Sequence, residues 1–175
     1  MKTNKAQILF EAFKQFNSEE VRKILDEKGI DPKVGIAIAE INLKPISFEG
    51  QEYYIYAARV MPKDNAGNQP YVTPHLHKHG SEPYYFLGKG EMNLGNLTPN
   101  GKSCIWQKPL SVNIGDKILI KENEIHSFRN NGEKACDFLF ACPKSHLIDF
   151  SGQNPDGDRH IVKQLKNGIP PHYLK

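Results

Sequence analysis

The chain has 175 residues, of which 38% are hydrophobic and 25% charged, and its formal net charge is +3 at pH 7. This length suits one domain with a sizeable core, and the mixed charge argues against nucleic acid as a partner. The cysteines Cys104, Cys136 and Cys142 form no CxxC pair, so we expect buried thiols in a reducing, cytoplasmic environment. The polar start and the lack of a long apolar run predict a soluble protein with no membrane partner.

The N-terminal region, residues 4–28, predicts two short helices, each with one apolar stripe. Ser18 is the expected N-cap of the second helix, and Gly29 is expected to end it. We assign residues 1–33 to a helical arm. We expect the arm to pack on the outside of a barrel, in preference to forming a lid or a dimer arm.

From Val34 the hydrophobic pattern changes to that of short strands separated by turn residues every eight to twelve positions. Such spacing is typical of an all-β sandwich or barrel and not of a βαβ fold. We assign residues 34–142 to the barrel and residues 143–175 to a tail that wraps it, with a possible strand over His160–Leu165. The apolar faces of the arm and of the tail favour a homodimer over a monomer.

A histidine-rich stretch precedes Glu82. On a strand successive side chains alternate between faces, so His75, His77 and His79 would point the same way. A lone histidine on a strand is usually an ordinary core or surface residue. The conjunction of three histidines with Glu82, and with His126 in a later hairpin, instead indicates a metal site, because imidazole and carboxylate bind Zn, Fe, Mn and Ni.

The spacing around these histidines resembles the first motif of the cupin superfamily, G(x)5HxH(x)3–4E(x)6G. The stretch His75-Leu76-His77 and Glu82 match its centre, while Gln69 and Lys89 occupy the places of its two glycines.

The second cupin motif, G(x)5PxGxxH(x)3N, is matched further along the chain. Gly115, His126 and Asn130 fall in register, while Lys121 and Asn123 replace the proline and the second glycine. These departures affect turns rather than metal ligands.

The resemblance implies a mainly all-β fold, the double-stranded β-helix or jelly-roll barrel, with one divalent transition metal (Fe, Mn, Ni or Zn) in its mouth. By the match, the metal ligands would be His75, His77, Glu82 and His126. His79 lies on the same face but is no ligand in the family pattern, so we expect it beside the ligands or at the rim of the pocket. The alternative is that His79 binds the metal in place of His75.

Three histidines and one glutamate leave open positions on a six-coordinate ion. We therefore expect a metalloenzyme that acts on a small, polar, oxygen-rich metabolite, either a dioxygenase or an isomerase. The isomerase alternative rests on a likeness to the cupin-type phosphoglucose isomerases, which Glu82-Pro83-Tyr84 and Gly88-Lys89-Gly90 echo. The other alternative is a cupin that binds a small molecule or a metal without turnover.

The residues that would serve such a reaction are less defined by spacing. Candidates for the catalytic base are a metal-activated hydroxide, Glu91 and Tyr84. A substrate anion would require Arg59, Lys89 or Arg129, each of which is otherwise an ordinary surface or ion-pair residue. Tyr84 could also bind the substrate through its hydroxyl group.

Overall fold

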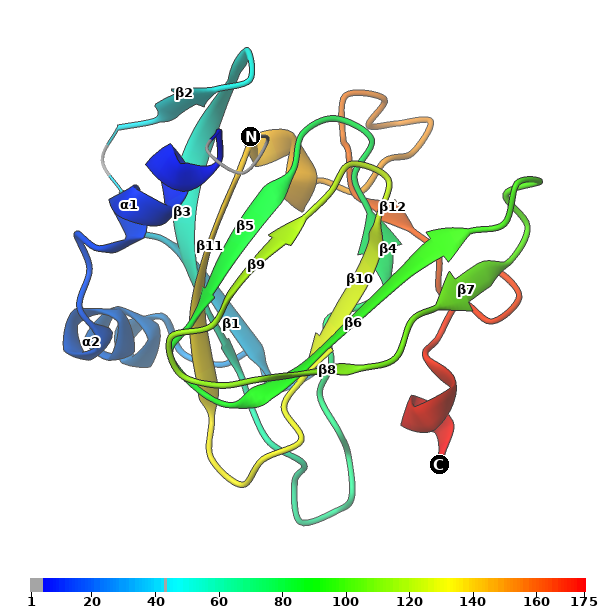
Figure 1. Ribbon diagram of the computed structural model, residues 1–175. Helices are drawn as coiled ribbons and strands as arrows, with labels where there is room; N and C mark the ends of the chain where they lie inside the picture. Colours follow the sequence, from blue (N-terminus) through cyan, green and yellow to red (C-terminus); the bar gives the residue numbers. More distant parts are fainter. Residues whose placement is uncertain (1–4, 43) are drawn as a thin grey trace.

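The protein is described by a computed structural model that covers residues 5–42 and 44–175 (Figure 1). Its strands form two antiparallel sheets that face each other across a core. The first sheet contains β1 (Ile36–Glu40), β2 (Ile46–Phe48), β3 (Gln51–Val60), β5 (Glu82–Phe86), β9 (Lys117–Ile120) and β11 (Cys136–Cys142). The second contains β4 (His75–Leu76), β6 (Gly90–Leu97), β7 (Cys104–Trp106), β8 (Leu110–Val112), β10 (Ile125–Arg129) and β12 (His160–Ile161).

The strand order departs from the order of the chain. The first sheet runs β1-β3-β11-β5-β9, with β2 on β3, and the second runs β12-β4-β10-β6-β7, with β8 on β6. The chain therefore crosses between the sheets at β4, β5 and β6 in succession. These crossings give a jelly-roll barrel, which confirms the predicted all-β fold.

The barrel interior is filled by side chains that alternate along the strands. On β3, Tyr56 and Ala58 point inward, whereas Ile55 and Ala57 point outward beneath the helices. The inward cluster is rich in aromatic rings, and the stacked rings of Phe86 and Phe128, 5.5 Å apart, join the two sheets. The interior therefore buries a large apolar surface between the two sheets.

The helices α1 (Gln7–Phe13) and α2 (Ser18–Lys28) cover the outer face of the first sheet (Figure 1). The prediction that Ser18 caps α2 was wrong by one residue. The N-cap is Asn17, whose Oδ1 accepts from the Glu20 amide at 2.9 Å, while the Glu20 carboxylate accepts from the Asn17 amide. Because this reciprocal capping box requires an acid three residues after the cap, Asn17 is favoured over Ser18.

The turn between β9 and β10 keeps its shape despite the replaced motif residues. Asn123 stands where the cupin motif has glycine, and its φ of 63° lies in the left-handed region that asparagine tolerates. Its amide donates to the His77 carbonyl at 2.8 Å, so the turn is tied to the histidine segment.

After β11 the chain forms η1 (Lys144–Leu147), β12 and η2 (Pro171–Leu174). This tail crosses one end of the barrel and then passes over the outer face of the second sheet (Figure 1).

Neither α-helix in the described part of the chain has both the length and the apolar character that a membrane span needs.

Asn130, the last residue of the second motif, holds the loop between β10 and β11. Its fully buried side chain donates to the Val60 carbonyl at 2.9 Å and the Lys134 carbonyl at 2.6 Å. Its Oδ1 accepts from the Gly132 amide at 2.9 Å. Three backbone groups therefore depend on this one amide.

The Asn130→Ala variant should lower the free energy of unfolding by about 2 to 4 kcal/mol, because it leaves buried backbone groups unpaired. Chemical denaturation measures the change. The exposed neighbour Asn131 is the matched control, and Asn131→Ala should change stability by less than about 0.5 kcal/mol. Equal effects of the two variants would contradict the assigned role of Asn130.

Candidate metal centre

Strands β4 and β10 place two histidines side by side at one end of the barrel. The antiparallel register pairs His126 directly with His75, and their rings lie 4.2 Å apart. Directly paired residues point to the same face of a sheet, which explains why residues so distant in sequence meet. His77 follows two positions after His75, and its ring lies 4.8 Å from that of His75 and 5.2 Å from that of His126.

Glu82 approaches this group from the opposite sheet, where it begins β5. Its Oε2 lies 3.0 Å from His77 Nε2, and its Oε1 lies 3.6 Å from His126 Nε2. The side chain is only 2% exposed, and the three histidines are likewise buried. The four residues therefore form one buried cluster that bridges the two sheets.

The outer nitrogens of the three imidazoles are fixed by backbone carbonyls. The Nδ1 of His75 lies 2.6 Å from the Thr73 carbonyl, that of His77 lies 2.8 Å from the Asp158 carbonyl, and that of His126 lies 3.2 Å from the Glu124 carbonyl. A carbonyl oxygen only accepts, so each Nδ1 carries the proton. Each Nε2 then presents a lone pair to the centre of the cluster, as in a metal-binding histidine.

Two of these Nε2 atoms have no hydrogen-bond partner. Within residues 5–42 and 44–175, the Nε2 atoms of His77 and His126 are buried and unpaired, because an unprotonated Nε2 and the nearby ionised Glu82 carboxylate are both hydrogen-bond acceptors. Leaving a buried polar atom unpaired is costly. The Nε2 atoms of His75, His77 and His126 lie within 4.8 Å of one another, a spacing that one metal ion can span. The residues therefore fit a divalent transition metal.

Burial sets the protonation states of the cluster. It lowers the pKa of His75 well below the ordinary value, and the neighbouring His126, His77 and Arg159 lower it further. It also lowers the pKa of His77. Burial raises the pKa of Glu82, but the surrounding imidazoles outweigh it and hold that pKa well below its usual range. Neutral imidazoles and an ionised carboxylate are the forms that bind metal.

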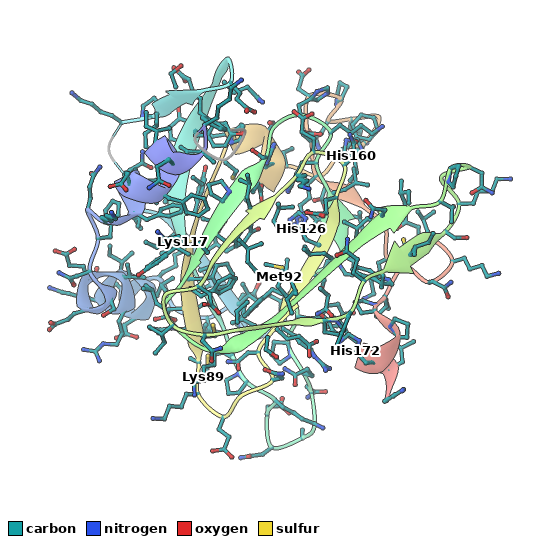
Figure 2. The ribbon with its side chains drawn as sticks, viewed as in Figure 1. Lys89, Met92, Lys117, His126, His160 and His172 are labelled. Carbon is teal, nitrogen blue, oxygen red and sulfur yellow. The ribbon has the colours of Figure 1, made fainter. Side chains whose placement is uncertain are left out.

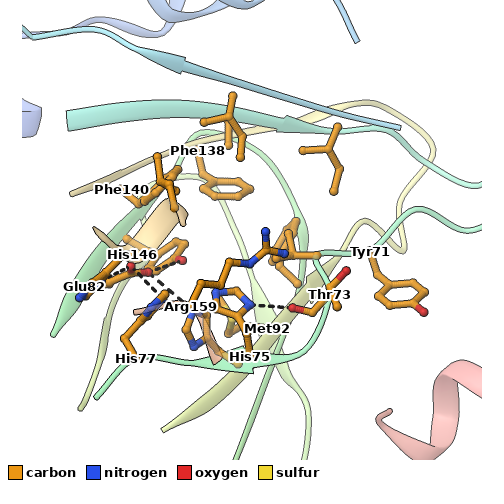
Figure 3. A pocket seen from close by; sticks show the side chains of 18 of the residues that line it. Tyr71, Thr73, His75, His77, Glu82, Met92, Phe138, Phe140, His146 and Arg159 are labelled. Atoms are coloured by element: carbon orange, nitrogen blue, oxygen red, sulfur yellow. Dashed lines mark hydrogen bonds and ion pairs between the residues drawn. The ribbon is translucent and has the colours of Figure 1, made fainter. Parts of the chain in front are cut away.

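His146, in η1, is a fifth member of the site that sequence reasoning missed. Its Nδ1 lies 2.6 Å from Glu82 Oε2, its Nε2 lies 2.6 Å from the His79 carbonyl, and its ring stacks on His77 at 3.9 Å (Figure 3). Burial lowers the pKa of His146, but Glu82 and the His79 carbonyl outweigh it and raise the pKa. The side chains of His77, Glu82 and His146 also offer ligand atoms within 4.8 Å of one another. Because both nitrogens of His146 face acceptors, we assign it the role of orienting Glu82 and not that of a ligand.

Asp158, in the tail, organises the segment that follows β4. Its carboxylate accepts from the backbone amides of Lys78 and His79 at 2.8 and 2.9 Å, while its carbonyl faces His77 Nδ1. The His79 side chain is exposed and stays outside the buried cluster. Sequence alone gave no periodic signal for His146 or Asp158, although the run Asp158-Arg159-His160 concentrates charge in the tail.

A cavity of about 300 Å³ opens beside the cluster. Apart from the cluster, its walls are mainly aliphatic and aromatic, and Arg159 reaches into it from the tail (Figure 3). The apolar lining comprises Val34, Ile36, Ile38, Ala58, Val72, Met92, Phe128, Phe138, Phe140 and Leu147. The site therefore joins polar ligands at one end to an apolar chamber.

Tyr84 lies where this chamber meets Glu82. Its hydroxyl donates to Glu82 Oε1 at 2.9 Å. Burial raises the pKa of Tyr84 well above its ordinary value, and the charge of Glu82 raises it further, so the side chain remains a neutral phenol. Tyr84 can hold Glu82 in place and lies within the cavity wall.

Several solved structures superpose on this chain. CapF, in complex with the inhibitor 3-isopropenyl-tropolone, superposes with a TM-score of 0.52 at 15% identity over 79% of this chain and 33% of CapF. The polyketide cyclase RemF from Streptomyces resistomycificus gives 0.41 at 21% identity, over 62% of this chain and 65% of RemF. A predicted oxalate decarboxylase from Thermotoga maritima gives 0.43 at 21% identity, over 61% and 77%.

The fold is that of a cupin. The matched part of this chain spans about a third of CapF and just under two thirds of RemF. No protein-family profile and no curated protein match the sequence. The likeness at this level of identity shows the architecture alone, so the chemistry of this protein must be argued from its own residues.

The structure places two other candidate residues on the outer face of the second sheet. Glu91 lies there beside Arg129, with 3.1 Å between Glu91 Oε1 and Arg129 Nε, and beside His172 at 2.5 Å. Arg129 also stacks on the ring of Tyr173. Neither Glu91 nor Arg129 lines the cavity.

The two remaining candidates also lie apart from the metal cluster. Arg59 lies on the outer face of the first sheet, with nitrogens 2.6 Å from Asp26 and 2.7 Å from Asp137. Lys89 is exposed in the turn at the far end of the barrel from His126 (Figure 2). The structure therefore brings together His75, His77, Glu82, His126 and Tyr84, and leaves the predicted anion-binding residues elsewhere.

The purified protein should carry about one transition-metal ion per chain, and a chelator should lower its melting temperature because metal binds only the folded state. His77→Ala and His126→Ala should each abolish metal binding, whereas the exposed His79→Ala should retain it. Metal analysis and thermal denaturation measure both. Loss of metal in His79→Ala equal to that in His77→Ala would show that the ligand assignment is shifted by two residues.

His146→Ala should weaken metal affinity by about 10- to 100-fold without changing stoichiometry, because it removes the partner that orients Glu82. Competition with a fluorescent chelator measures the affinity. His172→Ala is the matched control, since His172 contacts Glu91 on the outer face. An unchanged affinity in His146→Ala would show that Glu82 needs no such support.

Proposed function

We propose that this cupin is a metalloenzyme that binds one divalent ion through His75, His77, Glu82 and His126 and acts on a small organic molecule in the adjoining cavity. The observation behind this proposal is the pair of buried, unpaired Nε2 atoms on His77 and His126 at the cavity wall. Iron, manganese, nickel and zinc all accept this ligand set.

Four protein ligands on an octahedral ion leave two positions, which two adjacent oxygens of one substrate can occupy. A bound ion would supply Lewis-acid or redox chemistry at these oxygens. The substrate class is therefore a chelating hydroxy-carbonyl, diketone or keto acid. The largely apolar walls indicate that its oxygens are gathered at the metal end and that the rest of the molecule is less polar than a sugar.

Within this class we propose oxygenation in preference to aldose–ketose isomerisation. An isomerase needs a base that moves a proton between adjacent carbons. Among the described lining residues the carboxylates are Glu82, which belongs to the ligand set, and Asp31, which is exposed. Tyr84 already donates to Glu82, and Glu91 lies outside the barrel. An apolar chamber that excludes water suits an oxygen-dependent reaction.

The alternative is a cupin that binds a chelating molecule without turnover, which the scarcity of acids and bases in the cavity also supports. The two functions differ in one measurement. An oxygenase loaded with iron(II) consumes dioxygen and forms product with its substrate, whereas a binding protein gains thermal stability from the same compound and leaves it unchanged.

A thermal-shift screen of the metal-loaded protein should find hits among diketones, keto acids and hydroxy acids that carry an apolar group, because such compounds fill both the metal positions and the apolar chamber. These shifts should vanish in His126→Ala. Dioxygen uptake by the iron(II)-loaded protein is then measured with each hit. Stabilisation only by apolar compounds, unchanged by metal removal, would refute a metal-centred function.

We also propose that the chain works as a homodimer in a reducing compartment such as the cytoplasm. Its three cysteines are buried and free, as expected for reduced thiols. Exposed apolar side chains such as Ile105 and Ile114 on the barrel offer surface for self-association. Light scattering coupled to gel filtration gives the oligomeric state directly.

A further inference from the structure

Arg159 projects from the tail into the cavity (Figure 3). Its backbone is fixed on both sides: its amide donates to the Ile148 carbonyl, and its carbonyl accepts from the Phe150 amide, each at 3.0 Å. Among the described residues that line the cavity, it is the only lysine or arginine. A permanent positive charge is therefore held at a defined place in a mainly apolar wall.

The guanidinium of Arg159 is poorly paired for such a position. Its charged neighbour among the described residues is Asp149, whose Oδ1 lies 3.5 Å from Nη1 and whose side chain is 59% exposed. No described side chain or carbonyl accepts a hydrogen bond from this guanidinium, which has five N–H donors and whose side chain is 29% exposed. Arg59, by contrast, donates three hydrogen bonds to Asp26 and Asp137 at 2.6 to 3.0 Å.

The charge of Arg159 also acts on the site itself. It lies close enough to His75 to contribute, after burial and the other imidazoles, to the lowered pKa of that residue. A cation against apolar walls is stabilised most by an anion that hydrogen-bonds to it directly. Asp149 is a weak partner of Arg159 because its side chain is largely in solvent.

We propose that Arg159 forms an anion subsite in the cavity, which takes the carboxylate of an organic acid whose apolar body lies against Met92, Phe138 and Phe140. These three side chains line the same cavity (Figure 3). Binding of the other end of this ligand to a metal rests on the proposed function, whereas binding of its carboxylate to Arg159 does not. The planar fork of one guanidinium matches a carboxylate. A phosphate dianion would call for further cationic donors, which the described lining lacks.

The test compares two probes of the same shape, 3-phenylpropanoate and the neutral 3-phenylpropanamide, by titration calorimetry on the full chain. Both are measured with metal-free and with zinc-loaded protein, so that carboxylate binding to the metal is separated from binding to Arg159. Metal-free wild-type protein should prefer the carboxylate by about tenfold, and Arg159→Gln should reduce this preference to about one. Arg159→Lys should keep part of it, since it retains the charge without the fork.

Two variants serve as controls. Arg22→Gln, on the exposed face of α2, should keep the carboxylate preference. Asp149→Asn should increase carboxylate affinity, because it removes the competing anion. It also keeps the proposal testable if Arg159→Gln does not fold. Weaker carboxylate binding by Asp149→Asn would overturn the subsite.

The outcomes for the metal and for the anion are separate. A carboxylate preference that persists in Arg159→Gln, or none in the wild-type protein, overturns the anion subsite. Normal metal content in the same sample leaves the proposed function standing. A chain that holds no metal but shows the Arg159-dependent preference supports the subsite and refutes the metalloenzyme.

Discussion

The buried carboxylate of Glu82 is the constraint on which the site depends. An ionised carboxylate at 2% exposure is tolerated only if surrounding groups compensate it. Here His146 and Tyr84 do so, and they come from η1 and from β5. A metal ion on the free imidazole nitrogens would complete this compensation. Such an ion would also join the two sheets at the mouth of the barrel by charge, in addition to the aromatic rings that stack between them.

The strand pattern and the two motifs were sufficient to predict the jelly roll and the residues that meet in the buried cluster. Alternation along a strand places His75 and His77 on one face, and a pairing register then brings His126 to His75. The alternation is a local signal, whereas the place of His126 in the expected ligand set came from the motif resemblance and not from periodicity. Nothing periodic marks His146, Asp158 or Arg159, which reach the site only through tertiary contacts of an irregular tail.

The two motifs also did not predict the apolar character of the cavity. Ligand spacing suggested a polar metabolite, but the chamber is walled by inward residues such as Phe138 and Phe140. Their alternation on β11 is visible in the sequence, yet the same pattern describes ordinary core filling. Whether inward side chains fill a core or line a chamber depends on how far the two sheets stand apart at that end, and this separation is a property of the whole barrel.

The short pairing of β4 has a consequence for how the protein matures. This strand contains two residues and is held by β10 on one side and β12 on the other. The polar groups around this strand come from residues 75 to 159, so about half of the chain must be ordered before they meet. Contacts of such sequence separation are reached late in folding, because loop closure precedes any gain from them. A growing chain therefore offers only the neighbouring pair His75 and His77, and His126 joins them once β10 pairs with β4.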